Sequence, residues 1–145
     1  MRQSELKAIL KDHKLWLESD GKQGKRAYLE GADLQFVNLQ DANLYGANLT
    51  GADLTEANLR DTNLEGANLQ GANLHNANLH NADLRYASLR GANLVDAKFA
   101  TNFKKVGWFH YATFSEDQIP WVVLNPKYPQ WAHTLKWVKA KQLSA

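Results

Sequence analysis

In Ala47-Asn48-Leu49-Thr50-Gly51-Ala52-Asp53-Leu54, leucine recurs after five residues, and alanine stands two positions before each leucine. The same spacing continues on both sides. Leucine occupies every fifth position from 29 to 94, and Phe99 takes the next place. Alanine stands two positions earlier throughout, except for Val37 and Thr62. Fifteen consecutive pentads obey this rule, so the middle of the chain is an internal repeat.

A five-residue period fits neither standard element. On an α-helix five residues turn through about 500°, so successive leucines would rotate by about 140° and form no stripe. On a flat strand, odd spacing would send alternate leucines to opposite faces. All the leucines can face one interior only if the chain bends once in each pentad. The pattern therefore predicts a coil around a central column filled by leucine and alanine.

The pentad A-(N/D)-L-x-(G/x), seen also in Ala67-Asn68-Leu69-Gln70-Gly71, resembles the repeat of pentapeptide-repeat proteins. The resemblance implies an all-β solenoid, a right-handed quadrilateral β-helix with one pentad per side and four pentads per coil. Residues 13–29 also resemble the cap helix and entry turn of cyanobacterial-type members. We therefore expect about four to five coils, capped by an α-helix at each end.

Composition divides the chain into three expected segments. These are an N-terminal cap helix and entry turn at 1–26, the β-helix at 27–115, and a C-terminal cap at 116–145. The register breaks at Lys104, where an inward lysine would be costly, and returns at Phe109 and Phe114. We expect a loop or bulge at 101–107, then a partial last coil through the two phenylalanines.

Both flanks are expected to cover the open ends of the stack, because coils bury their apolar surface mainly against neighbouring coils. Near the N-terminus, helical spacing joins Leu6, Ile9, Leu10, His13, Trp16 and Leu17. Ser4 is expected as the N-cap of this helix and Asp20-Gly21 as its end. Near the C-terminus we expect an extended segment at 119–124, a turn at 125–129 and a helix over about 130–143. That helix would cover the last coil with Trp131, Leu135, Trp137 and Val138.

The chain of 145 residues is long enough for one domain with its own core. Cysteine is absent, which removes disulfides and thiolate chemistry. No apolar run is long enough for a signal peptide or a membrane span, so a cytoplasmic protein is expected. We also expect it to be a monomer. The net charge of +2 is unevenly distributed along the chain. Lys and Arg outnumber Asp and Glu by seven to four in 1–26 and by six to two in 102–145, whereas 27–101 holds four against nine.

Two histidines five residues apart, His75 and His80, raise the question of a metal site. If the leucines before them point inward, the two imidazoles lie on adjacent sides of the column, with a corner between them. Zinc sites need three or four converging ligands, and the neighbouring side chains are mostly amides. We therefore interpret both as lattice histidines that face solvent and His13 as a packing residue of the cap helix. Neither a metal ion nor another cofactor is expected.

Side chains twenty residues apart should stack on neighbouring coils, about 4.7–4.9 Å apart. Amide ladders are expected for Asn48 and Asn68, for Asn43 and Asn63, and for Asn38, Asn58 and Asn78. Asp33 would also stack on Asp53, and Asp41 on Asp61, although like charges directly opposite each other destabilise a sheet. We interpret these pairs as solvated faces, with a surface for a basic partner as the alternative.

One column combines residue types that anchor protein interfaces. Tyr45, Glu65, Arg85 and Lys105 are expected to stack, with Tyr86 beside Arg85 and two further arginines around the adjoining corners. The candidate protein-contact patch therefore comprises Tyr45, Glu65, Arg85, Tyr86, Arg60 and Arg90.

For function, we expect a non-enzymatic scaffold that presents rigid faces to an unidentified protein partner. The filled column offers no pocket, the five serines carry no nucleophile motif, and the carboxylates are exposed. No catalytic residue and no small-molecule substrate are therefore expected. The family resemblance adds an alternative, a DNA mimic that binds a DNA-handling enzyme such as gyrase. Binding of nucleic acid or a membrane by the basic segment 136–141 is a less favoured interpretation.

Overall fold

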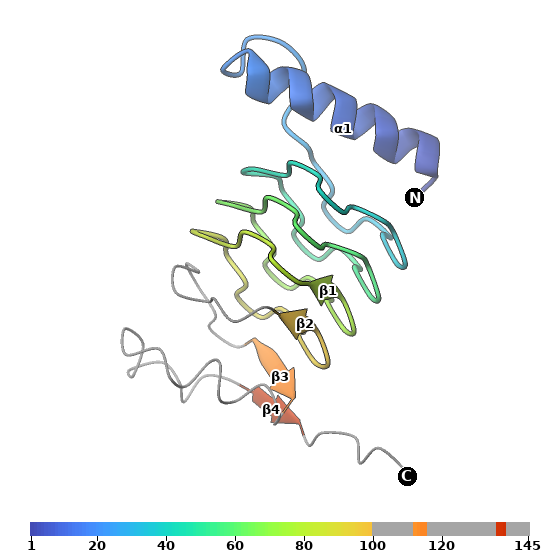
Figure 1. Cartoon of the computed structure of the whole chain (residues 1–145), viewed down its shortest axis with the longest axis vertical. Coiled ribbons are helices and arrows are strands. Elements are labelled where there is room, and N and C mark those ends of the chain that lie inside the picture. The colour runs from blue at the N-terminus through green and yellow to red at the C-terminus, as the bar shows by residue number, and fades with distance from the viewer. Residues whose placement is uncertain (100–111, 116–135, 139–145) are drawn as a thin grey trace.

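The computed structural model describes residues 1–99, 112–115 and 136–138. Its elements are helix α1 (Gln3–Glu18) and the short strands β1 (Asn78–Leu79), β2 (Lys98–Phe99), β3 (Thr113–Ser115) and β4 (Lys136–Val138). Figure 1 shows α1 lying across the N-terminal end of a stack of coils. β1 and β2 belong to successive coils, and β3 and β4 continue the stack toward its other end.

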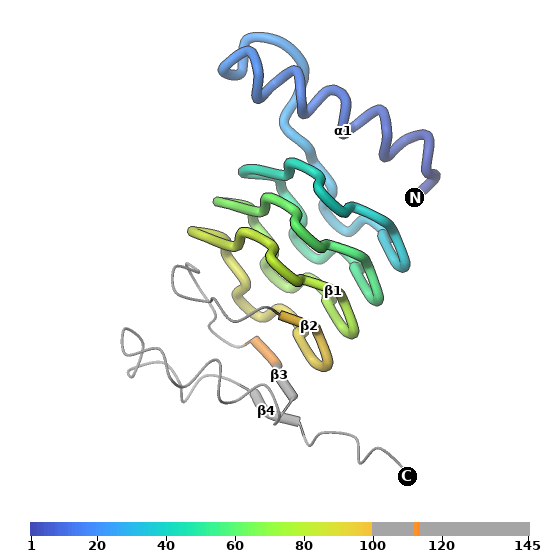
Figure 2. Tube along the Cα trace, in the orientation of Figure 1, coloured from blue at the N-terminus to red at the C-terminus, as the bar shows by residue number. Residues whose placement is uncertain are grey.

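Each pentad forms one side of a coil that closes after twenty residues. Parallel bridges join residues twenty apart, from Tyr28 with Asn48 to Asn93 with Thr113. The backbone bonds repeat with the same period: the Leu49 N–H donates to the Asn68 carbonyl at 2.7 Å. Four pentads therefore make one turn, as predicted, and the coils stack in register (Figure 2).

The chain turns at a corner after each leucine. At one corner the Ala52 N–H donates to the Leu49 carbonyl at 3.0 Å, and Gly51 between them has a φ of 63°. A turn with positive φ at its third residue favours Gly, Asn or Asp. Most corner residues are of these types, but Phe36, Glu56 and Tyr86 also adopt positive φ. The backbone at these three residues is therefore strained, and glycine at the same positions would not be.

The interior of the column is filled by the repeated leucines. Every leucine from 29 to 94 in the five-residue register is at most 7% exposed, which confirms that they share one interior. The alanines two positions earlier lie among them, and most are fully buried. Thr62 replaces one of these alanines. Its buried hydroxyl donates to the Leu39 carbonyl at 2.8 Å, so its polar group is satisfied.

Helix α1 covers the first coil with its apolar stripe. Leu6 and His13 are buried, and Ile9 and Leu10 pack against the core. The expected N-cap at Ser4 is wrong, because the helix begins at Gln3 with Arg2 as its N-cap. No helix among the described residues is long and apolar enough to cross a bilayer.

The start of α1 is set by a carboxylate one turn inside the helix. Glu5 Oε2 accepts the Arg2 N–H at 3.1 Å, so the backbone N–H of the N-cap residue has a partner without a serine cap. At the other end the Gly21 N–H donates to the Trp16 carbonyl, and Gly21 has a φ of 80°. The predicted end of the helix at Asp20-Gly21 is confirmed.

At the C-terminal end the chain returns to the five-residue register and then departs from the prediction. Ala112 is buried and Thr113 pairs with Asn93, so the return of the register is confirmed for 112–115. The expected helix over 130–143 is wrong at 136–138, because β4 pairs with β3 as a parallel strand.

A physical reason favours the strand. Without β4, one edge of β3 would leave its backbone N–H and C=O groups unpaired. A strand can pair with these groups, whereas a helix cannot. Trp and Val also favour extended backbone. The expected loop at 101–107, Phe109, the segments at 119–129, Trp131 and Leu135 lie outside the described residues.

Candidate functional site

Three exposed tyrosines lie at or beside one corner of the coils. Tyr86 occupies this corner itself, in the column that holds Gly46 and Gly66 in the two preceding coils. Tyr45 directly precedes Gly46 in the sequence. Tyr28 pairs with Asn48, which lies two residues after Gly46. The exposed fractions are 67% for Tyr28, 45% for Tyr45 and 65% for Tyr86. We call this surface, formed by Tyr28, Tyr45, Gly46, Gly66 and Tyr86, the tyrosine corner.

The two glycines leave the middle of the tyrosine corner without side chains. A Cβ atom added to Gly46 or Gly66 would meet nothing within 4 Å, so the ledge between the rings is open to solvent. Tyr86 has a φ of 59°. Left-handed backbone costs an ordinary residue about 1–2 kcal/mol, and an exposed ring gains little packing in return. Strain kept at an exposed aromatic residue points to a functional role.

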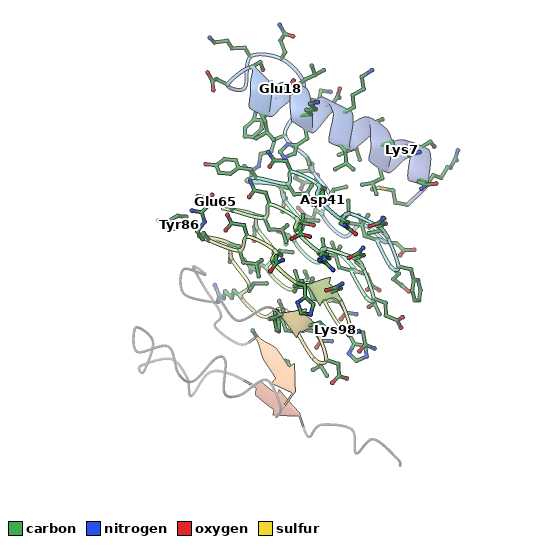
Figure 3. The ribbon with its side chains drawn as sticks, in the orientation of Figure 1. Lys7, Glu18, Asp41, Glu65, Tyr86 and Lys98 are labelled. Carbon is green, nitrogen blue, oxygen red and sulfur yellow. The ribbon has the colours of Figure 1, made fainter. Side chains whose placement is uncertain are left out.

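The guanidinium of Arg85 is held beside the tyrosine corner by two carboxylates. Arg85 Nη2 donates to Glu65 Oε2 at 2.8 Å, and Arg85 Nε donates to Asp83 Oδ1 at 2.8 Å. Hydrogen bonds and charge from Asp83, together with the charge of Glu65, raise the pKa of Arg85. Figure 3 shows Glu65 and Tyr86 together at one edge of the stack, away from Asp41 and Lys98. This arginine is therefore oriented before any partner binds.

The structure brings together four of the six residues of the predicted patch, namely Tyr45, Glu65, Arg85 and Tyr86. Arg60 lies one side away, where its Nε donates to Asp61 Oδ2 at 3.0 Å. Arg90 lies beyond the other corner, next to Gly91. Lys105 lies outside the described residues.

Sequence reasoning missed Tyr28, although its position twenty residues before Asn48 places it beside the same corner. Its hydroxyl donates to the Glu30 carboxylate, and this bond raises the pKa of Tyr28. Glu30 also accepts from Asn48 Nδ2 at 3.2 Å. The ring of Tyr28 is thus fixed by its own coil and by the next one.

The two lattice histidines lie on different sides, as predicted. His75 Nδ1 donates to the Val95 carbonyl at 3.1 Å and His75 is half-buried, whereas His80 is exposed. Among the described residues, no group of three or more His, Cys, Asp or Glu side chains could hold a metal ion. His13 is buried and stacks on Trp16 with ring centroids 5.5 Å apart, which confirms it as a packing residue.

The stacked aspartates Asp33 and Asp53 do form a bridge pair, as predicted. Asp53 accepts hydrogen bonds from Thr55 Oγ1 at 2.6 Å, Gln35 Nε2 at 2.8 Å and Asn73 Nδ2 at 3.3 Å. These bonds, the one from Thr55 first, lower the pKa of Asp53. Donors within the lattice therefore offset the repulsion, which supports a structural interpretation of this face.

A family model described as pentapeptide repeats matches residues 25–61 and 62–99, with eight copies. These ranges span just over half of the chain, and this chain belongs to the pentapeptide-repeat family. The family fold is the right-handed quadrilateral β-helix, in agreement with the coils described above. Comparison with curated proteins gave no match.

Several solved structures are similar to this chain. A pentapeptide repeat protein from the thylakoid lumen of Arabidopsis thaliana is 27% identical, with coverage of 70% of this chain and 77% of that one and a TM-score of 0.49. One from the cyanobacterium Cyanothece is 43% identical over 53% of this chain and 58% of that one, with a TM-score of 0.26. One from Nostoc is 24% identical over 90% and 96%, with a TM-score of 0.31.

Proposed function

We propose that this protein is a non-enzymatic scaffold that binds another protein through the tyrosine corner. The observation that carries the proposal is Tyr86, an aromatic residue that is 65% exposed at a backbone position where the two preceding coils hold glycine. A folded chain would be more stable with glycine there. Contact with a partner gives the ring a role that compensates for this strain.

The chemistry of the corner favours a protein as the partner. Tyrosine and arginine are the side chains most often found at the energetic centre of protein interfaces. The open ledge at Gly46 and Gly66 allows a partner backbone to approach closely, between rings that lie on either side. Arg85 is already oriented by two carboxylates that balance its charge, so little side-chain entropy is lost when it donates to a partner carbonyl oxygen.

DNA mimicry is the less favoured alternative. A mimic needs a continuous acidic surface, and at the tyrosine corner three uncharged rings separate the carboxylates, two of which are paired with Arg85. The acidic residues that stack elsewhere, such as Asp53, are bonded into the lattice. No specific observation therefore favours a DNA-handling partner. Cytoplasmic localisation and the monomeric state stay predictions.

The proposal is tested by affinity capture from the source cell with a variant of the tyrosine corner. The triple variant Tyr45→Ala/Arg85→Ala/Tyr86→Ala should lose the partner that the unaltered protein recovers. The matched control is Gln40→Ala/Arg60→Ala/His80→Ala, which removes exposed side chains, one arginine included, from the adjacent side. Retention of the partner by the first variant, or its loss only from the control, would show that the contact surface lies elsewhere.

A further inference from the structure

A groove of about 510 Å³ runs between α1 and the first coil. One wall is a single face of the N-terminal half of the helix, and the other is six consecutive residues of the coil. The lining residues are Gln3, Leu6, Lys7 and Leu10, together with Met1 and the segment 33–38. Leu34 is buried, and Leu6, Leu10 and Val37 belong to the core or pack against it. The groove is therefore apolar along its floor and its helical wall.

The floor of the groove is also the open end of a hydrogen-bonded ladder. In the coil below, the Asp53 N–H donates to the Ala32 carbonyl at 2.9 Å, and the Thr55 carbonyl accepts the Phe36 N–H at 2.9 Å. The equivalent groups of the first coil are the Asp33 N–H and the Gln35 carbonyl. Neither has a hydrogen-bond partner within the described part of the chain. The Asp33 carbonyl accepts from the Met1 amino group at 3.0 Å.

This open edge continues an existing set of parallel strands. The column runs from Asp33 through Asp53, Asn73 and Asn93 to Thr113 by bridges twenty residues apart. At its far end, β4 adds to β3 with a different spacing, so this column accepts a strand outside the regular repeat. An unpaired edge of this kind is a template for a further strand.

Phe36 marks the rim of the groove. Its side chain is 68% exposed and its φ is 56°. Among the described residues, Phe36 and Tyr86 are the two aromatic residues with positive φ. The strain at Phe36 therefore falls beside the groove, at a distance from the tyrosine corner, and this surface is independent of the one considered above.

We propose that the groove binds an extended peptide of a partner protein, which adds to Asp33–Val37 as one more parallel strand. The peptide accepts the Asp33 N–H and donates backbone N–H groups to the Asp33 carbonyl, where it displaces the Met1 amino group, and to the Gln35 carbonyl, as each coil does for the next. It places an apolar side chain over Leu34, between the coil and the helical wall. Phe36 covers the exposed side of that contact.

The carboxylate of Asp33 determines which polar side chains are favoured in the peptide. Asp33 already stacks on Asp53 in the coil below, so a third aspartate in the column would add repulsion, and asparagine is favoured at that position. Two residues further on, an amide donor is favoured, because Gln35 Nε2 makes this bond to Asp53 Oδ2 at 2.8 Å in the coil below. The peptide pattern is therefore small residue, Asn, Leu, Gln, Gly. The chain itself contains this pattern at 66–71, Gly-Ala-Asn-Leu-Gln-Gly.

The probe is a synthetic peptide with the sequence of residues 66–71 and blocked ends, titrated into the ¹⁵N-labelled full-length protein. Saturable amide shifts are expected at Asp33, Gln35 and Phe36, with none at β1 or β2. The matched control peptide carries an N-methyl group on its last glycine, which removes the donor to Gln35. We expect it to bind about ten-fold more weakly, the effect of about 1.4 kcal/mol.

Two protein variants complete the test. Phe36→Gly should weaken peptide binding, whereas Glu56→Gly, which relieves the same backbone strain at the same corner one coil below, should leave it unchanged. Equal effects of the two variants, equal binding of both peptides, or shifts confined to other sites would overturn the proposal. Shifts at Asp33 that appear on concentrating the protein without peptide would also overturn it, in favour of a second copy of this chain.

Discussion

His13 Nδ1 accepts a hydrogen bond from the Ala27 N–H at 3.0 Å, and this buried bond ties helix α1 to the first residue of the repeat. The imidazole is fully buried and stacks on Trp16. Its other nitrogen, Nε2, is buried and finds no hydrogen-bond partner among residues 1–99, 112–115 and 136–138. The cap is therefore joined to the coil by one neutral imidazole in a defined tautomer.

The first prediction concerns pH. Burial first, and then the charge of Arg26, lower the pKa of His13 from 6.5, while a backbone contact with Tyr45 acts in the opposite direction. Between the two pKa values the unfolded chain binds more protons, so the free energy of unfolding falls as the pH drops below about 6.5. Protonated Nδ1 would also become a donor facing the Ala27 N–H. Denaturant unfolding measured between pH 8 and pH 5 checks this.

Two variants isolate the imidazole. His13→Gln keeps an acceptor for the Ala27 N–H and cannot titrate, so this part of the pH dependence should disappear. His80→Gln, at an exposed histidine, should keep the pH profile of the unaltered protein. Identical profiles for both variants would mean that another group is responsible.

The second prediction concerns the column. Leu54 is fully buried, so Leu54→Ala should lower the free energy of unfolding by about 2–5 kcal/mol through lost burial and a cavity. Leu15→Ala makes the same chemical change on α1, where the side chain is 39% exposed, and should cost less, about 1 kcal/mol, because less apolar surface is buried. Equal losses in chemical denaturation would contradict the assignment of the leucines to one shared interior.

The third prediction concerns the turn between the cap and the coil. A Cβ atom on Gly24 would lie 2.2 Å from the Asp12 carbonyl oxygen, and Gly24 has a φ of 67°. Gly24→Ala therefore forces the backbone of the turn away from α1. Gly51→Ala has a similar φ of 63° but meets nothing within 4 Å, so it should cost only about 1–2 kcal/mol. Melting temperatures should fall much further for the Gly24 variant, and a reversed order would contradict the close approach of this turn to the helix.

The fourth prediction separates stability from binding. Tyr86→Gly should raise the free energy of unfolding by about 0.5–1 kcal/mol, because glycine adopts positive φ without strain. The same variant should recover less of the partner in affinity capture. Asn81→Gly is the control, since asparagine already tolerates this backbone, and should gain less stability without loss of binding. A Tyr86→Gly protein that is less stable would remove the argument from strain.

The repeat could be predicted well from sequence because its cause is local. A leucine at every fifth position, with a small residue two before it, can face one interior only if each pentad bends. Asn48 over Asn68 and Asp33 over Asp53 then follow from the twenty-residue period. Tyr45, Glu65, Arg85 and Tyr86 could be grouped for the same reason.

The ends were harder, because contacts distant in sequence decide them. The apolar spacing near Trp137 is compatible with a helix, and pairing with β3, distant in sequence, makes a strand there more favourable. The role of His13 likewise depends on Ala27, fourteen residues away. Such pairings leave no periodic signal.

The sequence by itself determined the coil, its filled interior and the order of side chains along each face, because a strict period leaves one arrangement that buries every leucine. Only the tertiary structure decided where the hydrogen-bonded ladder of the coils ends and which element covers that end. The groove under α1, with Phe36 at its rim, exists because a helix covers the first coil without supplying the N–H and C=O partners that another coil would. The position of that helix depends on side-chain packing and one buried hydrogen bond, which no repeat specifies.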